Sequence, residues 1–382
     1  MTDCLVIGGG LIGMLTAREL RLAGAEVRLV ERGAAGQEAS WAGGGILSPL
    51  YPWRYPSPVT ALARWSQQAY AGFSSELANE TGIDPEWTKN GLLILDDSEK
   101  AIARAWAVDV GARLDLIEAG TVRQCEPGLR APSQEALWMP DVAQIRNPRL
   151  LNALKVDLPA LGVIVEEHAE ITGFVVKNDR VEGVETRHGR ITAGRVVVAA
   201  GAWSGQLLAG LGYALDVAPV RGQMILFRAR PGVVSRIVLS HGHYLVPRCD
   251  GRVLAGSTLE YVGFDKTTTE EALAELSRAA IAMVPALAGH EIERHWAGLR
   301  PGSPCGVPYI GEHPRVQGLF VNAGHFRNGV VMGPASARLL ADILLRRKPV
   351  LDPAPYALEN RVSMDCGAEA LRRRDSHCGF IP

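Results

Sequence analysis

Arg327 stands out because it is a long cationic side chain placed among small residues. It lies in the stretch NAGHFRNGVVMGPASARLL, 322–340, between a phenylalanine and an asparagine and with glycines on both sides. The apolar run 318–324 predicts a final parallel strand, and 334–345 predicts a helix with a proline near its first turn. We therefore expect Arg327 in a loop that precedes a helix N-terminus, where small neighbours leave room for a bound molecule. A capping group within that loop is the alternative.

A second arginine, Arg300, lies in HWAGLRPGSPCGVPYIG, 295–311. This segment predicts a short strand that ends at Arg300, followed by a rigid loop rich in proline and glycine. A guanidinium held there can bind a carboxylate through two parallel hydrogen bonds, which fix the orientation of the bound group as well as its affinity. From these residues alone, an ion pair at the surface remains the alternative.

The elements that must position these arginines begin with a dinucleotide-binding segment. The sequence pattern predicts a strand at 3–7, a helix at 11–23 and a second strand at 26–31. Between strand and helix, Gly8, Gly10 and Gly13 have the spacing that permits a tight turn, close approach of a pyrophosphate and close packing of the helix. Glu31 ends the second strand, where a carboxylate can accept hydrogen bonds from both ribose hydroxyls and would repel a 2′-phosphate.

A second glycine-rich stretch, GQEASWAGGGILSP at 36–49, bears on which dinucleotide is bound. An NAD-binding unit normally continues into its next helix. This stretch instead has little helical or strand pattern, and it is long enough to follow an extended cofactor. Its small residues 42–45 allow the backbone to pass close to a flat ring system, and Ser40 can hydrogen-bond to phosphate. The sequence therefore favours FAD over NAD, with a flexible surface loop as the alternative.

The rest of the chain predicts a second unit inserted into the first. Helices are predicted at 61–82, 99–111 and 148–161, a strand at 91–97, and a turn-rich connector at 126–132. A meander that turns at 177–179 and at 187–189 leads into an apolar strand ending at Gly201, which should rejoin the parallel sheet. Strands with turns then alternate through 221–254, and a helix is predicted at 268–283.

These elements predict an α/β fold with two interwoven domains, for which a chain of 382 residues with 47% hydrophobic residues is long enough. A Rossmann-like FAD-binding domain with a β-meander is assigned to 1–50, 145–218 and 300–360. An α+β substrate domain with a mainly antiparallel sheet is assigned to 51–144 and 219–299. Residues 361–382 form a C-terminal tail, for which a frayed terminus is the simplest interpretation.

Composition argues against several kinds of partner. The formal charge is −1, with 40 basic and 41 acidic residues, so no broad field would attract nucleic acid or anionic lipid. The N-terminal apolar run lacks a basic leader, and no later run is long enough to span a membrane. The six cysteines show no metal-binding spacing, which suits reduced thiols in a cytoplasm. We therefore expect a cytoplasmic protein without a metal, membrane or nucleic-acid partner.

Six motifs in order connect these features. They are the glycine pattern at 8–13, EASWAGGGILSP at 38–49, VVVAAGAWS at 196–204, YLVPR at 244–248, WAGLRP at 296–301 and GHFRNGVVMGP at 324–334. Together they resemble the D-amino-acid oxidase family of flavoproteins, and most closely its glycine-oxidising members of the thiamine pathway. The resemblance covers residues 1 to about 360.

The resemblance implies roles for individual residues. Arg300 becomes the clamp for the substrate carboxylate, Tyr244 hydrogen-bonds to the same group, and Arg327 lies over the substrate pocket. The positive end of the helix after Arg327 would face the flavin edge on which negative charge gathers during reduction. The implied FAD-binding residues are Gly8, Gly10, Leu11, Ile12, Gly13, Glu31, Arg32, Ala39, Ser40, Gly44, Gly45, Ile46, Ile171, His325, Phe326, Arg327, Asn328, Gly329, Val330 and Val331.

The resemblance also implies the chemistry. Non-covalent FAD would accept a hydride from the α-carbon of glycine, sarcosine or a small D-amino acid, and dioxygen would reoxidise the flavin to yield hydrogen peroxide. The imine product would hydrolyse to the 2-oxo acid and ammonia. No protein base is needed if the amine binds neutral, and the sequence shows no evident constellation of paired acids or His/Asp near these motifs. The family implies a homotetramer and a role in making the thiazole of thiamine.

Three other readings remain open from the sequence. A sarcosine-oxidase-like enzyme would attach its flavin covalently through a cysteine, but Cys305 lies about five residues after the position where that cysteine would align. A D-amino-acid dehydrogenase would pass electrons to a quinone instead of to dioxygen. A flavin-binding protein without turnover belongs to a different class, and reduction of the flavin by glycine without air would exclude it.

Overall fold

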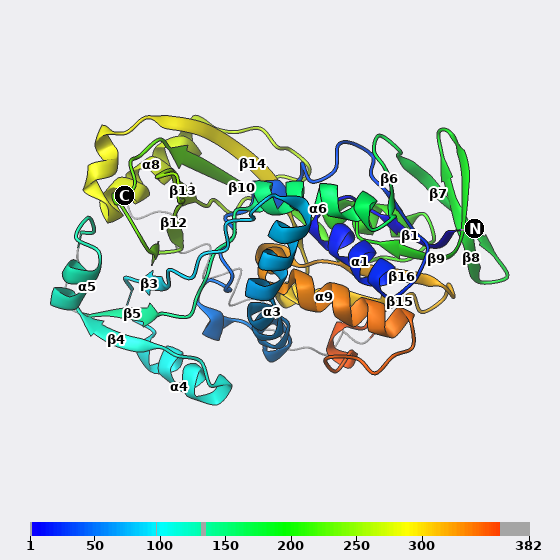
Figure 1. Ribbon diagram of the computed structural model, residues 1–382, viewed down its shortest axis with the longest axis horizontal. Helices are drawn as coiled ribbons and strands as arrows, with labels where there is room; N and C mark the ends of the chain where they lie inside the picture. Colours follow the sequence, from blue (N-terminus) through cyan, green and yellow to red (C-terminus); the bar gives the residue numbers. More distant parts are fainter. Residues whose placement is uncertain (1, 97, 131–134, 360–382) are drawn as a thin grey trace.

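The computed structural model describes residues 2–96, 98–130 and 135–359. Within them, two sheets lie at opposite ends of the molecule, with the long helix α3 (Ser57–Thr81) between them (Figure 1). The predicted tail at 361–382, the end of the connector at 126–132, Cys366 and Cys378 all lie outside the described residues.

The first sheet is built on the predicted β-α-β unit. Its strand order is β15-β16-β9-β1-β2-β6, and β1 runs parallel to both β2 and β9. The parallel strands are β1 (Thr2–Ile7), β2 (Val27–Val30), β6 (Ile164–Glu166), β9 (Gly189–Val198) and β16 (Leu319–Ala323), with β15 (Tyr309–Glu312) antiparallel at the edge. The sheet therefore has the parallel order expected of a Rossmann-like unit.

The predicted β-meander is present and rejoins this sheet. Strands β7 (Ile171–Lys177) and β8 (Arg180–Thr186) pair antiparallel, β8 pairs antiparallel with β9, and β9 then runs beside β1. Asn178 and Asp179 both have positive φ at the first turn, 50° and 56°, which is the backbone that a two-residue hairpin with right-handed twist requires.

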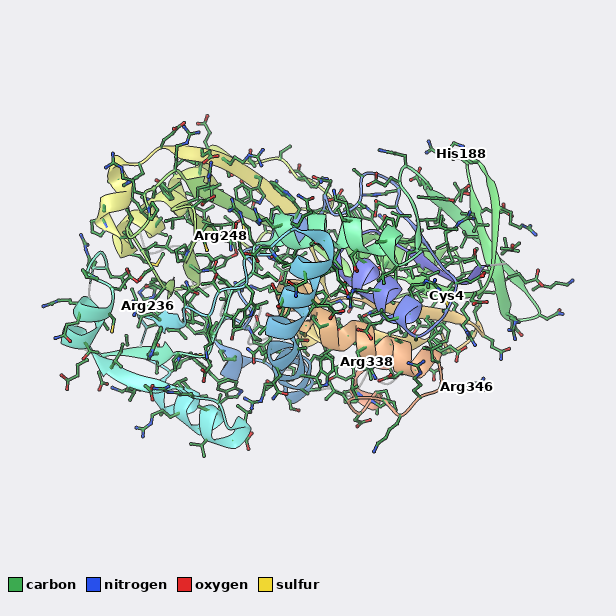
Figure 2. All side chains as sticks on the ribbon, in the orientation of Figure 1. Cys4, His188, Arg236, Arg248, Arg338 and Arg346 are labelled. Atoms are coloured by element: carbon green, nitrogen blue, oxygen red, sulfur yellow. The ribbon has the colours of Figure 1, made fainter. Side chains whose placement is uncertain are left out.

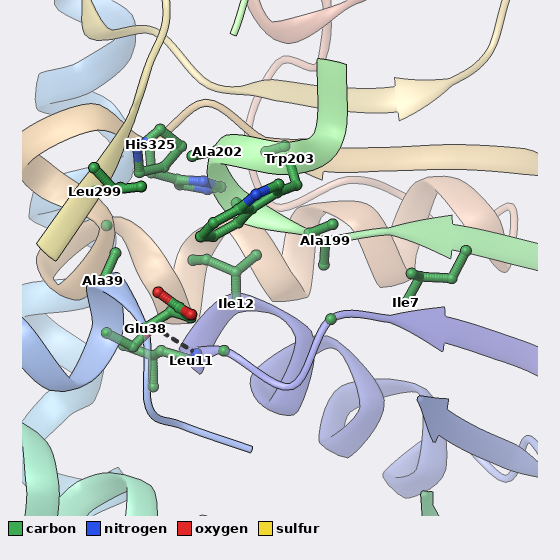
Figure 3. A pocket seen from close by; sticks show the side chains of 18 of the residues that line it. Ile7, Leu11, Ile12, Glu38, Ala39, Ala199, Ala202, Trp203, Leu299 and His325 are labelled. Carbon is green, nitrogen blue, oxygen red and sulfur yellow. Dashed lines mark hydrogen bonds between the residues drawn. The ribbon is translucent and has the colours of Figure 1, made fainter. Parts of the chain in front are cut away.

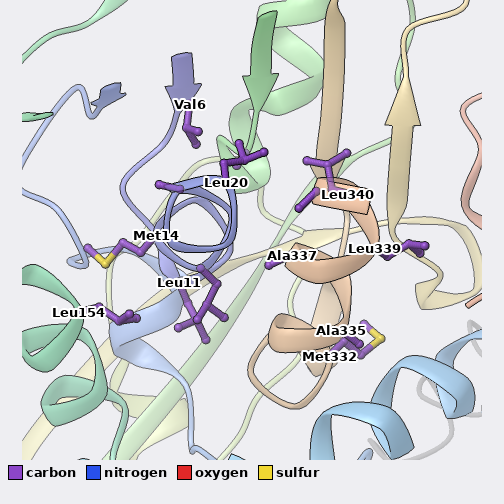
Figure 4. Packing of buried hydrophobic residues seen from close by; sticks show 14 of the residues in the cluster. Val6, Leu11, Met14, Leu20, Leu154, Met332, Ala335, Ala337, Leu339 and Leu340 are labelled. Carbon is purple, nitrogen blue, oxygen red and sulfur yellow. The ribbon is translucent and has the colours of Figure 1, made fainter. Parts of the chain in front are cut away.

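Alternate residues of the parallel strands pack against opposite faces of the first sheet. Cys4 and Val6 contact a core formed with α1 (Leu11–Leu22), α6 (Asn147–Ala160), α3 and α9 (Gly329–Leu344), as Figure 4 shows around Val6, Leu20 and Leu340. Leu5 and Ile7 face a second core with the meander. Burial on both faces explains why these strands are almost continuously apolar.

The second sheet is mainly antiparallel, and its strand order is β14-β10-β13-β12-β11-β3-β5-β4. Its longest strands, β10 (Ala218–Phe227) and β14 (Ile292–Gly302), pair along their whole length. The other strands are β3 (Leu92–Ile94), β4 (Asp115–Glu118), β5 (Glu135–Met139), β11 (Ile237–Ser240), β12 (His243–Pro247) and β13 (Val253–Gly256). Four helices accompany it or link it to the first sheet, namely α4 (Lys100–Val110), α5 (Ala119–Cys125), α7 (Ser204–Ala209) and α8 (Glu270–Met283).

The fold class is thus confirmed, whereas the exact domain boundaries stay a prediction. Four local expectations differ from the structure. The stretch 36–49 contains a one-turn helix, α2 (Ala39–Ala42). The strands β4 and β5 and the helix α5 between them lacked a clear pattern in the sequence. Arg300 lies in the eleven-residue β14 and not in a short strand. Cys4, Cys125 and Cys249 are free, but Cys305 is disulfide-bonded, so the expectation of reduced thiols is wrong at Cys305.

Candidate functional site

The turn between β1 and α1 forms the predicted glycine cradle. Gly8 has φ of +111°, and a Cβ there would lie 2.4 Å from the carbonyl oxygen of Ala199. A Cβ at Gly13 would lie 1.9 Å from the carbonyl oxygen of Gly8, so α1 can pack this close to the strand only with glycine at that position. The structure therefore gives the first and third glycines the steric roles that the sequence pattern predicted.

The N-terminus of α1 is bridged by the second glycine-rich stretch. The Leu11 N–H donates to the Ser40 hydroxyl oxygen at 2.9 Å. Asn147 holds the stretch in place, because its side-chain amide donates to the carbonyl oxygens of Ser40 at 2.7 Å and Gly43 at 3.1 Å. Sequence reasoning missed Asn147, which looks like the ordinary first residue of α6. The free N–H groups of a helix start, together with the Ser40 hydroxyl, form a suitable place for phosphate.

Glu31 lies where a ribose-binding carboxylate is expected. One carboxylate oxygen accepts the Gly9 N–H at 2.7 Å and the other accepts the Gly33 N–H at 2.9 Å, which fixes the group at the end of β2. Arg32 places its guanidinium 3.8 Å from the centre of the Trp203 ring. Sequence reasoning missed Trp203, although it lies in one of the six motifs.

A cavity of about 330 Å³ connects these groups with the region of the two arginines (Figure 3). The predicted residues that line it are Gly8, Gly10, Leu11, Ile12, Glu31, Arg32, Ala39, Ser40, Ile171, Arg300, His325, Phe326, Arg327, Gly329 and Val330. The other predicted residues do not line it, namely Gly13, Gly44, Gly45, Ile46, Asn328, Val331 and Tyr244. Glu38 and Trp203 line it without having been predicted.

The helix after Arg327 begins earlier than the sequence indicated. The helix α9 starts at Gly329, so Pro334 lies inside it and the predicted start near Pro334 is wrong. Proline has no N–H and cannot bond to the carbonyl four residues back, which belongs to Val330. The buried Tyr70 hydroxyl donates to this carbonyl instead, and the Ala335 N–H donates to the Ser66 hydroxyl at 2.9 Å. Side chains of α3 thus replace backbone bonds beside the cavity.

Arg300 lies on β14, and its guanidinium lies over the neighbouring strand β10. It donates to the carbonyl oxygens of Arg221 at 3.3 Å and Thr258 at 3.1 Å, and to the Ser257 hydroxyl at 2.8 Å. Gly222 makes this possible, because a Cβ there would lie 2.1 Å from an Arg300 nitrogen. Three neutral acceptors position the cation but do not neutralise its charge.

The electrostatic environment of Arg300 favours an anion. Burial, followed by the nearby charge of Arg327, lowers the pKa of the Arg300 guanidinium from its usual value to about 10. The phenols of Tyr244 and Tyr55 and the Glu260 carboxylate act on the pKa of Arg300 in the opposite direction. A guanidinium destabilised in this way is stabilised by a bound carboxylate, because opposite charges restore the preference for the protonated form.

Tyr244 is packed between two glycines. A Cβ at Gly256 would lie 2.9 Å from its ring, and a Cβ at Gly44 would lie 3.0 Å away. The buried hydroxyl donates to the Met224 sulfur at 3.4 Å, a weak acceptor. A stronger acceptor, such as a carboxylate oxygen, could replace the sulfur as its partner.

Tyr55 is a further aromatic residue that the sequence did not identify. The Phe326 and Tyr55 rings both come within 3.7 Å of the position a Cβ would take at Gly306. Tyr55 follows a short turn (Pro52–Arg54) that the Arg54–Glu99 ion pair, at 2.8 Å, ties to the start of α4. The inserted unit therefore brings an aromatic side chain to the region of Arg300.

Two absences concern only the described part of the chain. Among its residues, no three His, Cys, Asp or Glu side chains are grouped so that they could hold a metal ion. No helix in the same residues has the length and apolar character needed to cross a membrane.

The fold and the cavity define a class of protein: a dinucleotide-binding oxidoreductase whose second sheet brings Arg300 to the cavity. Comparison with known proteins supports this class and makes it specific. The family described as FAD dependent oxidoreductase matches residues 3–343. The chain therefore belongs to the FAD dependent oxidoreductase family.

Individual relatives agree with this family. A protein named glycine oxidase from Pseudomonas aeruginosa is 50% identical over 359 residues, which are 94% of this chain and 99% of the relative. The crystal structure of glycine oxidase from Geobacillus kaustophilus superposes with a TM-score of 0.89 at 30% identity, covering 94% of this chain and 99% of that one. The bifunctional protein ThiO/ThiG of Synechocystis sp. is 32% identical over 91% of this chain and 52% of its own length.

Proposed function

We propose that the protein catalyses the oxidative deamination of glycine, and also of sarcosine or small D-amino acids, to the 2-oxo acid, ammonia and hydrogen peroxide. The observation that carries the proposal is the partly buried Arg300 guanidinium, hydrogen-bonded to neutral oxygens and close to Arg327, at the edge of a cavity that begins at a dinucleotide cradle. The name and 50% identity of the Pseudomonas relative support the choice of glycine.

The residues of the cavity suit FAD. The cradle at Gly8 and Gly13 has no room for a Cβ, and the N-terminus of α1, Ser40 and Glu31 lie where phosphate and ribose groups of FAD would need donors and acceptors. When bound, FAD supplies the hydride acceptor for the amine and the site at which dioxygen is reduced. The residues of the chain position the two reactants.

The Arg300 guanidinium binds and orients the substrate carboxylate in this mechanism, and Tyr244 turns its hydroxyl from the Met224 sulfur to a carboxylate oxygen. Arg327 adds positive charge on the same side. The first N–H groups of α9 favour negative charge in the cavity, because a helix N-terminus carries a partial positive charge. The α-carbon is thereby fixed beside the flavin, and its amine reacts in the neutral form without a side-chain base.

Turnover should depend on pH, because the substrate amine reacts in its neutral form. Deprotonation of the substrate amine increases the reactive fraction, so turnover should rise from neutral to alkaline pH. The imine released from the site is hydrolysed by water to the 2-oxo acid and ammonia. A flat pH profile over this range would contradict the role given to the neutral amine.

The test is an oxygen-uptake screen of the purified yellow protein with glycine, sarcosine and small D-amino acids. We expect uptake with glycine and accumulation of peroxide. Arg300→Ala should keep its yellow colour but require a much higher substrate concentration, because truncating one member of a buried charge pair costs about 2–5 kcal/mol. Reduction of a dye without oxygen uptake would instead indicate a dehydrogenase.

Non-covalent binding of FAD is part of the proposal. Cys305 is the cysteine nearest the position of covalent attachment in the sarcosine-oxidase-like alternative, and it is disulfide-bonded. Acid precipitation should therefore leave the flavin in the supernatant. Yellow colour in the pellet would contradict this part of the proposal.

Three further statements belong to the same proposal. We expect a homotetramer in the cytoplasm, with dioxygen as the second substrate. The relation to ThiO/ThiG supports a role in thiamine thiazole biosynthesis, for which the oxidised glycine would be the precursor. The roles of the twenty-two residues discussed as catalytic or FAD-binding belong to the same proposal.

A further inference from the structure

The segment 260–268, which we call the strap, runs from the second sheet to the cofactor cavity. It lies between β13 and α8 and contains no helix or strand. Its side chains Phe264 and Lys266 contact Trp203 and Glu38, respectively, and both of these residues line the cavity. Sequence analysis assigned the strap no role.

Arg221 attaches the strap to β10 of the second sheet. This buried residue of β10 exchanges two backbone hydrogen bonds with Glu260, at 2.9 and 3.0 Å. Its guanidinium also donates to the Glu260 carboxylate at 3.0 Å, to the Asp265 carboxylate at 2.7 Å and to the Thr267 carbonyl at 2.9 Å. Both ends of the strap are therefore held to the second sheet.

The first contact with the cavity is aromatic. The Phe264 ring lies 5.4 Å from the Trp203 ring, centre to centre, and the Arg32 guanidinium lies 3.8 Å from the same Trp203 ring. Trp203 is thus held between Arg32, which follows a strand of the first sheet, and Phe264 of the strap. Arg32 directly follows Glu31, the carboxylate expected at the ribose, so its contact with Trp203 relates Trp203 to the nucleotide end of the cavity.

The second contact is electrostatic. The Lys266 ammonium lies 3.1 Å from the Glu38 carboxylate, and the Arg32 guanidinium lies 3.6 Å from it. Glu38 lines the cavity together with Leu11, at the start of α1 (Figure 3). A dinucleotide bound with its pyrophosphate at this helix start would meet the negative charge of Glu38, and Lys266 offsets that charge.

We propose that the strap, which is attached to the second sheet, retains the bound dinucleotide by closing the end of the cavity that holds the nucleotide. Phe264 and Lys266 are positioning residues that act through Trp203 and Glu38. This inference rests on the non-covalent FAD of the proposed function. It assigns a task in cofactor retention to a segment that is separate from the substrate-binding arginines.

The test measures how fast the holoenzyme releases FAD after dilution, followed by the rise in flavin fluorescence. Phe264→Ala should release FAD about fivefold faster, because an aromatic pair contributes about 1 kcal/mol beyond its buried area. Tyr261→Ala is the matched control, since Tyr261 lies in the same strap, is 67% exposed and has no ring contact with Trp203. Phe264→Leu, which keeps apolar bulk, provides a second variant if the alanine variant folds poorly.

The electrostatic arm uses Lys266→Met, with the exposed Lys177→Met on β7 as control. Lys266→Met should accelerate release severalfold, and adding Glu38→Gln should restore slow release because the uncompensated charge is then removed.

The possible failures can be told apart. Flavin that remains with acid-precipitated protein contradicts non-covalent binding and the strap together. Flavin that is released, but at the same rate from Phe264→Ala as from Tyr261→Ala and from Lys266→Met as from Lys177→Met, contradicts the strap alone.

Discussion

At the scale of single residues, the site depends on the chemical difference between arginine and lysine. Arg300 is partly buried near a second cation and is positioned by neutral oxygens. A guanidinium tolerates this environment because its ordinary pKa lies well above that of an ammonium. Its fork of donors also leaves directions free for a carboxylate after the three protein acceptors are satisfied.

Arg300→Lys tests this difference between arginine and lysine through the pH dependence of substrate binding. Burial and the charge of Arg327 lower the pKa at this position, so a cation is present below the lowered pKa and is lost as pH rises through it. Because lysine starts roughly two units below arginine, we expect substrate binding by the variant to fail roughly two pH units earlier than in the wild type. The measurement is KM for glycine against pH. Parallel KM profiles would show that this charge does not bind the substrate.

At the scale of elements, α9 contains a proline in its interior, Pro334, although the sequence pattern predicted this proline at the start of the helix. Pro334 leaves the Val330 carbonyl without an N–H from the same helix, and Tyr70 of α3 supplies the missing donor. Ser66 receives the next N–H, so α3 maintains the first turns of the helix that lines the cavity. The distance along the chain between Tyr70 and Val330 explains why sequence periodicity placed the helix start incorrectly.

Tyr70→Phe should therefore weaken both folding and FAD binding. An unpaired buried carbonyl costs about 1–3 kcal/mol, which chemical denaturation can measure. Tyr356→Phe is a matched control, because the Tyr356 hydroxyl donates to the Pro58 carbonyl at 2.8 Å and Pro58, unlike Val330, does not line the cavity. Both variants should lose stability, but only Tyr70→Phe should raise the dissociation constant of FAD.

A rescue variant separates this role from general packing. Pro334→Ala in the Tyr70→Phe background returns an N–H that can bond to the Val330 carbonyl, so FAD affinity should recover in part. No recovery in the double variant would mean that the Tyr70 hydroxyl acts in some other way than by pairing this carbonyl.

At the scale of the whole molecule, the second sheet positions the glycine-rich stretch of the first unit. Arg248, labelled in Figure 2, donates to the carbonyl oxygens of Gly44 at 2.9 Å and Ile145 at 3.2 Å, and to the Gln144 side chain at 2.8 Å. The Trp296 indole N–H donates to the Ala42 carbonyl at 3.1 Å, and Tyr244 packs on Gly44. The glycine-rich stretch 36–49 is thus held in shape by side chains that lie on or next to strands of the second sheet.

Arg248→Met should remove these hydrogen bonds and thereby lower the stability of the whole fold. Burial lowers the pKa of Arg248 to about 10, and removing the side chain leaves three acceptors unpaired. We expect the free energy of unfolding to fall by about 3 kcal/mol or more, with weaker FAD binding. Arg113→Met, at an exposed ion pair, should change stability by at most about 1 kcal/mol. Equal stability of the two variants would contradict the role of Arg248.

The sequence by itself determined the β-α-β unit, the glycine cradle, the meander and the antiparallel second sheet. Each of these depends on local spacing or backbone sterics, as the contact between Gly13 and Gly8 illustrates. It also indicated Arg300 and Arg327 through their unusual neighbours. Only the tertiary structure decided which side chains complete the cavity. The groups that Asn147, Trp203, Tyr70 and the strap contact lie far away along the chain. A hydrogen bond or ring contact with a distant asparagine, tryptophan or tyrosine produces no periodic pattern in the sequence, so the sequence could not predict it.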